Sequence, residues 1–400
     1  MKKIILFVTL FLSINVNAQK FEGLAKTPPM GWNSWNRFTC NVNEKLIREA
    51  AEAMVSSGMK DAGYIYINID DCWQGKRDSL GFIHPDPTRF PSGMKALSDY
   101  IHSLGLKFGI YTDEGWMTCG GKPGSRGHEY QDAMTYAKWG VDYLKDDYCY
   151  TDYLNPEGAY LTMRNALYAT GRPIVYSICM WGNGCEVWAK EVGHLWRTTG
   201  DIHPTFDATP TKGDESPLGV LQILDKQKDL RKYAGPDHWN DPDMLEVGNG
   251  MSVNEDRAHF SMWCMLAAPL IAGNDLFNMN KETSEILLNK EAIAVDQDTL
   301  GIEGFLYSSK GDVEIWAKPL SDGDWAICFL NRGTKQEEVN YSWKQNEIID
   351  TLTHREMNFT IENYKIRDLW QHKEIGTTEK DFNALILSHD VVLLRLKLLR

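Results

Sequence analysis

The sequence predicts a (β/α)8 barrel followed by a smaller all-β domain, because two different rhythms follow each other along the chain. From about residue 25 to 300, short apolar runs alternate with amphipathic helical stretches, and this unit occurs eight times. Eight units over about 275 residues match a (β/α)8 barrel in both strand number and length. After about residue 303 the chain changes to short segments with a period of two, separated by turn residues, which is typical of an antiparallel sandwich.

The predicted strands share one feature: each is an apolar run that ends in polar or aromatic residues. They are 30–36 (MGWNSWN), 64–73, 107–113, 142–147, 173–181, 194–201, 238–244 and 269–275. The predicted helices between them are 44–60, 93–105, 129–140, 157–170, 217–232 and 255–267. The glycines in SSGMKDAGY and HSLGLKFG are expected to end helices ahead of the next strand. An open doubly wound sheet is the main alternative, but no GxGxxG motif follows the first strand.

The first 18 residues have the pattern of a secretory signal peptide. Lys2 and Lys3 precede an apolar run over 4–14, and VNA predicts cleavage after Ala18. The run is too short to span a bilayer, and a buried N-terminal element is the alternative. The barrel is then expected over residues 19–302 and the β-sandwich over 303–400. The mature protein is expected to be exported to the periplasm or the extracellular space, as a soluble protein.

Composition narrows the class of ligand. The formal net charge of −13 argues against nucleic acid or an anionic membrane as a partner, since both favour a basic face. The 14 Trp, 17 Tyr and 14 Phe residues suit a neutral, ring-shaped ligand, because aromatic faces stack on apolar rings.

The cysteines point to disulfides rather than to a metal. Export permits disulfides, but spacing alone does not give their pairing. No CxxC pair and no HExxH helix is present, so neither a metal site nor a cofactor is expected. The eight cysteines are Cys40, Cys72, Cys119, Cys149, Cys179, Cys185, Cys264 and Cys328.

The stretch DYLKDDYCY carries unusual charge at the end of an apolar strand. Alternate side chains of a strand share a face, so Lys145 and Asp147 lie on one face while Leu144 and Asp146 lie on the other. Leu144 is expected to meet the helix layer, which directs Lys145 and Asp147 into the barrel mouth. A neighbouring lysine keeps a carboxylate ionised, the state that a nucleophile needs. A surface salt bridge is the alternative for this segment.

A second acid is required if the chemistry is glycoside hydrolysis. Asp201 in HLWRTTGDI is the candidate, with Arg197 four residues earlier; helix capping and structural pairing are their respective alternatives. Asp70 and Asp71 in NIDDCW can accept hydrogen bonds from sugar hydroxyls, or they can cap a loop. Asp243 in WNDPDM is a further candidate, whereas the nearby Asp241 has the position of a turn residue.

Three aromatic residues near predicted strand ends can form an apolar wall for a pyranose ring, although core packing is the common fate of a tryptophan. They are Trp35, Trp181 and Tyr111.

Seven motifs along the chain form a recognisable set. They are TPPMGWNSWNRF, NIDDCWQGKRD, DPTRFPSGMKALSDYIHSLGLKFGIYTD, TCGGKPGS, DYLKDDYC, WRTTGDI and WNDPDMLEVGN. In this order and with similar gaps they resemble the signatures of the glycoside hydrolase family 27 α-galactosidases, the melibiase-like enzymes of clan D. The resemblance runs from about residue 25 to 300, and more weakly into the β domain. It implies a catalytic (β/α)8 barrel that releases terminal α-linked galactose.

The resemblance also implies a role for each candidate residue. Asp147 matches the family's nucleophile and Asp201 its acid/base. Asp70 and Asp71 match the pair that binds O4 and O6 of the sugar. The other matching positions contact the substrate: they are Lys145 beside the nucleophile, Arg197 near the 2-hydroxyl, Trp35 and Trp181 in stacking or pocket positions, Tyr111, Cys119, Asp243 and Met244 in the pocket, and Cys179 where the substituent at C2 is sensed.

Two disulfides, Cys40–Cys72 and Cys119–Cys149, match family disulfides that tie active-site loops together. The resemblance leaves open the pairing of Cys179, Cys185, Cys264 and Cys328.

The chain departs from the family pattern beside these positions. Many relatives have an aromatic residue at Asp146, and many have glycine or asparagine at Tyr148. Met180 stands where plant-type members have glutamate. Enzymes for N-acetylgalactosamine usually carry small residues in this loop, so a free 2-hydroxyl is expected in the substrate.

The resemblance implies a retaining exo-hydrolase that needs no cofactor and takes a terminal α-galactoside as its partner molecule. Lys145 is expected to lower the pKa of Asp147, while the charge of Asp147 and partial burial raise the pKa of Asp201, against the effect of Arg197. The alternatives are a same-fold β-L-arabinopyranosidase or α-N-acetylgalactosaminidase, and a non-catalytic galactose-binding protein. The natural substrate and the oligomeric state do not follow from the sequence.

Overall fold

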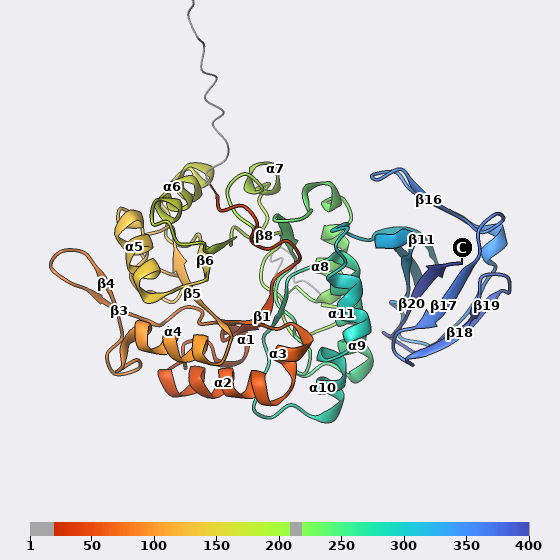
Figure 1. Ribbon diagram of the computed structural model, residues 1–400, viewed down its shortest axis with the longest axis horizontal. Helices are drawn as coiled ribbons and strands as arrows, with labels where there is room; N and C mark the ends of the chain where they lie inside the picture. The colour runs from red at the N-terminus through yellow and green to blue at the C-terminus, as the bar shows by residue number, and fades with distance from the viewer. Residues whose placement is uncertain (1–19, 209–217, 400) are drawn as a thin grey trace, which may run out of the picture.

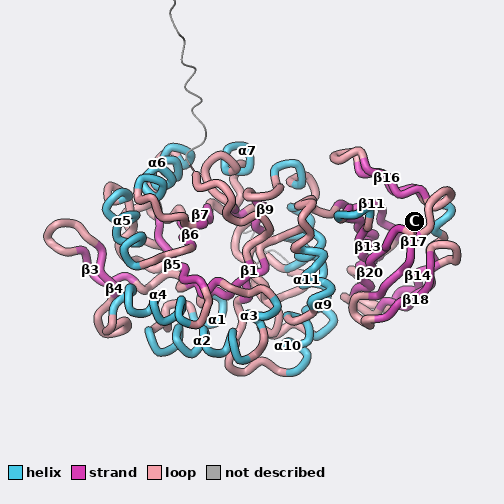
Figure 2. The backbone as a smooth tube through the Cα atoms, viewed as in Figure 1, coloured by secondary structure: helices cyan, strands magenta, loops and turns pink. Residues whose placement is uncertain are grey.

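The computed structural model describes residues 20–208 and 218–399, so the predicted signal peptide lies outside the described residues. Its larger part is an eight-stranded parallel sheet in the order β10-β1-β2-β5-β6-β7-β8-β9. The chain just after β9 closes the ring, because Leu245 bridges Ala272 of β10 in parallel. The predicted (β/α)8 barrel is therefore confirmed, with helices packed around the strands (Figure 2).

All eight barrel strands fall inside the predicted apolar runs, but most are shorter than those runs. Their bounds are β1 Met30–Asn33, β2 Tyr66–Asn68, β5 Lys107–Asp113, β6 Tyr143–Asp147, β7 Val175–Ile178, β8 Leu195–Arg197, β9 Trp239–Asp241 and β10 Leu270–Ala272. The residues that follow each strand form the loops of the barrel mouth, where the polar ends of the apolar runs lie.

The helices follow the prediction with one break and several additions. The single helix expected over 44–60 is α2 Glu44–Ser56 followed by α3 Met59–Ala62, because Gly58 adopts a left-handed backbone (φ 87°) that interrupts the helix. The sequence pattern did not predict α1, α7, α10, α11 or the short hairpin β3 Gln74–Arg77 with β4 Ile83–Pro85. The remaining helices are α1 Trp35–Phe38, α4 Gly93–Ser103, α5 Glu129–Trp139, α6 Pro156–Ala169, α7 Glu186–Ala189, α8 Val220–Gln227, α9 Val253–Leu266, α10 Lys281–Leu287 and α11 Lys290–Asp296, with a 3-10 turn at Arg231–Tyr233.

An antiparallel β-sandwich follows the barrel, as predicted, and lies against α9 (Figure 1). Its main sheet has the order β11-β12-β13-β20-β17-β18, and two antiparallel two-stranded sheets complete the domain: the long-range pair β14–β19 and the hairpin β15–β16. The strands are β11 Phe305–Lys310, β12 Val313–Pro319, β13 Trp325–Asn331, β14 Glu337–Tyr341, β15 Glu347–Asp350, β16 Arg355–Asn358, β17 Tyr364–Asp368, β18 Lys373–Thr377, β19 Phe382–Ile386 and β20 Val391–Leu398, with 3-10 turns at Ser321–Gly323 and Trp343–Gln345.

The sandwich and the barrel share one apolar core. Trp316, Leu330 and Leu393 of the sandwich are buried in the same cluster as Phe260 and Met262 of α9. A second core inside the sandwich contains the remaining inward-facing side chains of its strands. Since burial of each large apolar side chain contributes about 1.5–3 kcal/mol, the joint is a stabilising interface and not a flexible linker. No helix among the described residues is long and apolar enough to cross a bilayer.

Candidate active site

The site residues predicted from the sequence converge on the barrel mouth. Asp147 ends β6 and Arg197 ends β8. Tyr111 lies near the end of β5, and Asp70 comes two residues after β2. Because all eight strands are parallel, their carboxyl ends meet at one face of the barrel, and these side chains are brought together there.

The carboxyl group of Asp147 is held from two sides. The Tyr111 hydroxyl donates to its Oδ2 at 3.1 Å, and the backbone N–H of Tyr148 donates to its Oδ1 at 3.0 Å. Burial raises the pKa of Asp147 to about 6, and the Lys145 charge, which works in the opposite direction, only limits the rise. Lys145 thus lowers the pKa of Asp147 as expected, but burial has the larger effect and the pKa lies above its ordinary value.

Lys145 has a different direct partner from the one expected. Its Nζ lies 2.8 Å from Asp70 Oδ2 and sits over the Tyr111 ring, 5.2 Å from the centroid. Asn33 Nδ2 donates to the same Asp70 oxygen at 2.8 Å, a contact that the sequence did not predict. The ammonium group thus links Asp70 to the carboxyl of Asp147, on which it acts through space.

Asp201 and Asp243 share one guanidinium. Arg197 Nη2 lies 3.0 Å from Asp201 Oδ1 and 2.8 Å from Asp243 Oδ2. Partial burial raises the pKa of Asp201, but the charges of Arg197 and Lys145 outweigh it, so the pKa lies below its ordinary value. The expected raised pKa of Asp201 is therefore wrong. The reason is the direct contact with Arg197, while 64% of the Asp201 side chain remains exposed.

Cys179 contacts the neighbours of both candidate acids, since its N–H donates to the carbonyl of Asp146 and its sulfur contacts Arg197. Its thiol is fully buried, one residue beyond β7, and Arg197 Nη1 lies 3.7 Å from its sulfur. Burial raises the pKa of this thiol, the charges of Asp147 and Asp201 raise it further, and Arg197 and Lys145 lower it. The charges of Asp147, on β6, and of Asp201, in the loop after β8, therefore both affect the pKa of this thiol.

Asp71 combines a site position with a loop-capping role. Its Oδ2 accepts the backbone N–H of Gly120 at 2.6 Å, and its Oδ1 accepts that of Cys72 at 2.6 Å. These contacts confirm the loop-capping interpretation of Asp71, and its role as a sugar-binding acid stays a prediction.

Both expected disulfides are present, and they connect loops of the mouth. Cys40 is bonded to Cys72, and Cys119 to Cys149. The four cysteines whose pairing was left open, Cys179, Cys185, Cys264 and Cys328, are buried free thiols.

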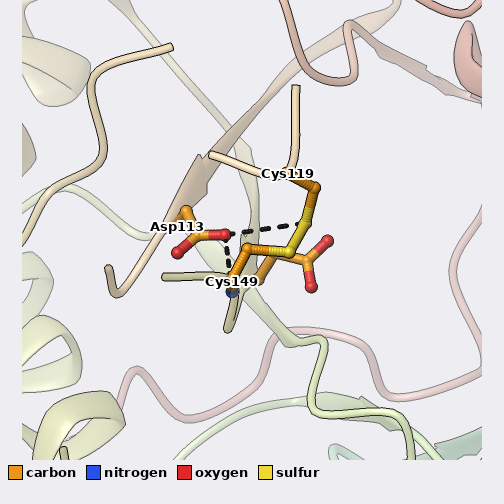
Figure 3. A group of neighbouring side chains, drawn as sticks. Asp113, Cys119 and Cys149 are labelled. Carbon is orange, nitrogen blue, oxygen red and sulfur yellow. Dashed lines mark hydrogen bonds between the residues drawn. A yellow bond between two sulfur atoms is a disulfide. The ribbon is translucent and has the colours of Figure 1, made fainter. Parts of the chain in front are cut away.

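Asp113 is a site residue that the sequence pattern did not single out, although it ends the apolar run of β5. Figure 3 shows its carboxylate beside the Cys119–Cys149 disulfide, where Asp113 Oδ2 accepts the backbone N–H of Cys149 at 3.0 Å. With Asp147 these side chains form a cluster of metal-ligating residue types whose candidate atoms lie within 4.8 Å of one another. The two sulfurs are bonded to each other, however, so they cannot supply the thiolates that such a metal site needs.

The remaining predicted residues line the mouth with less defined contacts. Trp35 and Trp181 are half-buried, and Trp181 holds a left-handed backbone with φ 55°. Met244 is buried directly after Asp243, whose carboxylate accepts its backbone N–H at 2.8 Å. Left-handed backbone at a bulky residue is strained and concentrates at functional sites.

A closed parallel barrel with an appended β-sandwich, and with carboxylates from separate strands around one space, defines the class of barrel glycoside hydrolases. Residues 27–298 match the family model described as alpha galactosidase A, and residues 310–396 match that of the alpha galactosidase C-terminal beta sandwich domain. The protein belongs to the α-galactosidases of glycoside hydrolase family 27.

Individual relatives agree along nearly the whole chain. Alpha-galactosidase A of Cellvibrio japonicus is 56% identical over 388 residues, which cover 97% of this chain and 96% of the relative. The crystal structure of α-galactosidase I from Mortierella vinacea is 40% identical with a TM-score of 0.88, and the match covers 94% of this chain and 98% of that one. The structure of α-galactosidase from Saccharomyces cerevisiae with raffinose is 30% identical with a TM-score of 0.87, over 96% of this chain and 100% of that one.

Proposed function

We propose that this α-galactosidase is an exo-acting, retaining hydrolase in which Asp147 is the nucleophile and Asp201 the acid/base. The observation that carries the proposal is a chain of contacts across the mouth. Arg197 lies 3.0 Å from Asp201 and 3.7 Å from the Cys179 sulfur, and the Cys179 N–H donates at 2.8 Å to the carbonyl of Asp146, the residue before Asp147. Two carboxyl groups on either side of one sugar ring are what glycoside hydrolysis requires.

In the first step Asp147 attacks the anomeric carbon while Asp201 gives its proton to the departing oxygen. A covalent galactosyl ester forms on Asp147. Asp201 then takes a proton from water, and the resulting attack releases galactose with its configuration kept. A pKa of about 6 leaves the ionised form of Asp147, which a nucleophile needs, favoured at pH 7.

Asp201 is the group that the substrate has to change. Its carboxylate is paired with Arg197 and largely exposed. A sugar ring bound over it would exclude water, and a sugar hydroxyl would compete for Arg197. Both effects raise the pKa of Asp201 toward the protonated state that an acid needs.

Galactose recognition is assigned to the two acids after β2. Asp70 and Asp71 are buried side by side at the mouth, and Lys145 holds Asp70 at 2.8 Å. Paired carboxylates can accept hydrogen bonds from O4 and O6, the latter of which an arabinopyranoside lacks. The wide identity with α-galactosidases favours galactose over the arabinopyranoside and N-acetylgalactosaminide alternatives.

Export is the remaining part of the proposal. Two disulfides among the described residues fit an oxidising compartment, and the apolar segment over 4–14 fits a signal peptide. Mass spectrometry of the mature chain should find Gln19 as its first residue, and an intact first 18 residues would contradict export by cleavage.

Chemical rescue tests the direction of attack. Asp147→Gly should be inactive, and azide should restore turnover of an activated α-galactoside while producing β-galactosyl azide. Formation of the α-azide would contradict the assignment.

Substrate choice is tested with three nitrophenyl glycosides. The rate on the α-galactoside should exceed the rate on the β-L-arabinopyranoside, which in turn should exceed the rate on the α-N-acetylgalactosaminide. A faster rate on either of the last two than on the α-galactoside would overturn the substrate assignment.

A further inference from the structure

Directly behind Asp147 two acidic side chains meet at one phenol. Asp146 lies on β6 and Glu114 follows β5, and both are completely buried. The hydroxyl of Tyr176, on β7, donates to Asp146 Oδ2 at 2.7 Å and lies 3.3 Å from Glu114 Oε1. The two acids interact with each other through their side chains. Neither belongs to the proposed catalytic pair.

The charges of these acids have no cationic partner. Among the ion pairs formed by the described residues, none involves Glu114 or Asp146. Their second oxygens, Glu114 Oε2 and Asp146 Oδ1, are buried and accept no hydrogen bond. A buried carboxylate oxygen without a donor is destabilising, and two adjacent carboxylates in a buried site do not both ionise. A proton between these two oxygens removes both penalties.

The acidic groups packed around the pair disfavour a second negative charge, whereas the hydrogen bond of the Tyr176 hydroxyl lowers the pKa of both acids. Asp147 faces Asp146, and Asp113 and Glu129 face Glu114. The other titratable neighbours are the phenols of Tyr148, Tyr160 and Tyr176. The pKa of Glu114 is raised to about 8, and burial is the largest cause. The pKa of Asp146 is also raised, by burial first and by the Glu114 charge second.

We propose that Glu114 and Asp146 share one proton between Oε2 and Oδ1, and that this protonated pair positions Asp147. The proposal rests on the nucleophile role proposed for Asp147. The backbone connections are direct: the N–H of Glu114 donates to the carbonyl of Asp147 at 3.0 Å, and the carbonyl of Asp146 accepts the N–H of Cys179 at 2.8 Å. Loss of the shared proton places two like charges in contact between the ends of β5 and β6, which displaces the strand end that carries Asp147.

Amide replacements test the shared proton. In Asp146→Asn the amide nitrogen can take the place of Oδ1 and donate to Glu114 Oε2, so the pair needs no shared proton. In Glu114→Gln the amide nitrogen takes the place of Oε2 and donates to Asp146 Oδ1. Asp146→Leu removes the hydrogen bond altogether. The wild type and the three full-length variants are compared by Tm between pH 5 and 9, and by kcat and kcat/KM over the same range with nitrophenyl α-galactoside.

The sign of the stability effect follows from the raised pKa. The folded pair keeps a proton that the unfolded acids lose above about pH 4, so its contribution to stability falls as pH rises to about 8 and then levels off. The wild-type Tm should therefore fall relative to that of Asp146→Asn by about 2–4 °C between pH 5 and 8. Comparing the two proteins cancels buried acids that do not interact with the pair, such as Asp296, because both proteins contain them.

Each arm of the experiment has a result that overturns it. A Tm difference that stays constant from pH 5 to 9 in both amide variants would refute the shared proton, whether or not Asp146→Leu folds.

At pH 6, kcat should be kept within about threefold in Asp146→Asn and fall about tenfold or more in Asp146→Leu. Above pH 8 Asp146→Asn should exceed the wild type in kcat/KM. Equal kcat in the Asn and Leu variants would refute the positioning role. An error in the nucleophile assignment would leave the Tm result unchanged, so the two failures are distinguishable.

Discussion

The acidic residues at the two ends of strand β6 differ in whether a cationic side chain neutralises them. Asp142, just before the strand, lies 2.6 Å from Arg172 Nη2 and 2.7 Å from His102 Nε2, and it also accepts the N–H of Phe108 at 2.9 Å. At the other end Asp147 has no direct cationic contact among the described residues, and Asp146 faces another acid. The first end is neutralised as a structural ion pair is. At the carboxyl end, Asp146 and Asp147 are buried acids without a direct cationic partner. Such an arrangement does not stabilise the fold, and it is typical of a catalytic site.

The largest effect should come from the mouth end. Asp147→Asn keeps the shape of the side chain but removes the nucleophile, and kcat should fall by at least about a thousandfold. The measurement is steady-state hydrolysis of nitrophenyl α-galactoside, with circular dichroism to establish that the variant is folded. Retention of more than about a tenth of the activity would contradict the role of Asp147.

A smaller, substrate-dependent effect is expected at Asp201. Asp201→Ala should lower kcat/KM by about 10²–10⁴-fold on raffinose, whose leaving group needs a proton. The loss should be much smaller on a dinitrophenyl galactoside, whose leaving group departs without one. An equal loss on the two substrates would show that Asp201 binds the sugar and does not act as the acid.

The pH dependence of activity tests whether Asp147 must be ionised, since kcat/KM should fall by about tenfold per pH unit below the pKa of Asp147. Since protonated Asp147 cannot attack, kcat/KM on the dinitrophenyl substrate should fall as pH drops below about 6. Lys145→Met should move this limb to higher pH, because the lysine charge favours the ionised carboxylate. A limb that stays in place would mean that another group titrates.

The smallest effect on activity should come from the opposite end of β6. Asp142→Asn breaks the contacts with Arg172 and His102, and it should lower the free energy of unfolding by about 1–3 kcal/mol. Urea unfolding measures this loss. At a temperature where the variant is folded, kcat should match the wild type; a loss comparable with that of Asp147→Asn would erase the distinction between the two ends.

Much of the site could be predicted from the local sequence pattern. The features that could not be predicted depend on contacts between residues far apart in the chain. The alternation over 143–147 was enough to separate Lys145 and Asp147 from Leu144 and Asp146, and the strand ends predicted which residues reach the mouth. The partner of Lys145 could not be predicted, because Asp70 is 75 residues away in the chain. The order of the two pKa values was wrong for the same reason: burial of Asp147 and the Arg197–Asp201 contact are properties of three-dimensional distances.

Some missed features did leave a local signal. Asp113 ends an apolar run, just as Asp147 does, and Glu114 follows it directly, so their position in the chain indicates that they lie near the end of β5 at the mouth. The β3–β4 hairpin was overlooked because its strands are short and polar, so they lack the periodicity of a buried strand.

The most direct test of the account is to trap the galactosyl ester and locate it. A 2-deoxy-2-fluoro-galactosyl fluoride of α configuration should inactivate the enzyme slowly, and mass spectrometry of its peptides should place one fluorogalactosyl group on Asp147. A label on Asp146 or Asp201, or steady turnover to a product of inverted configuration with no ester, would contradict the account.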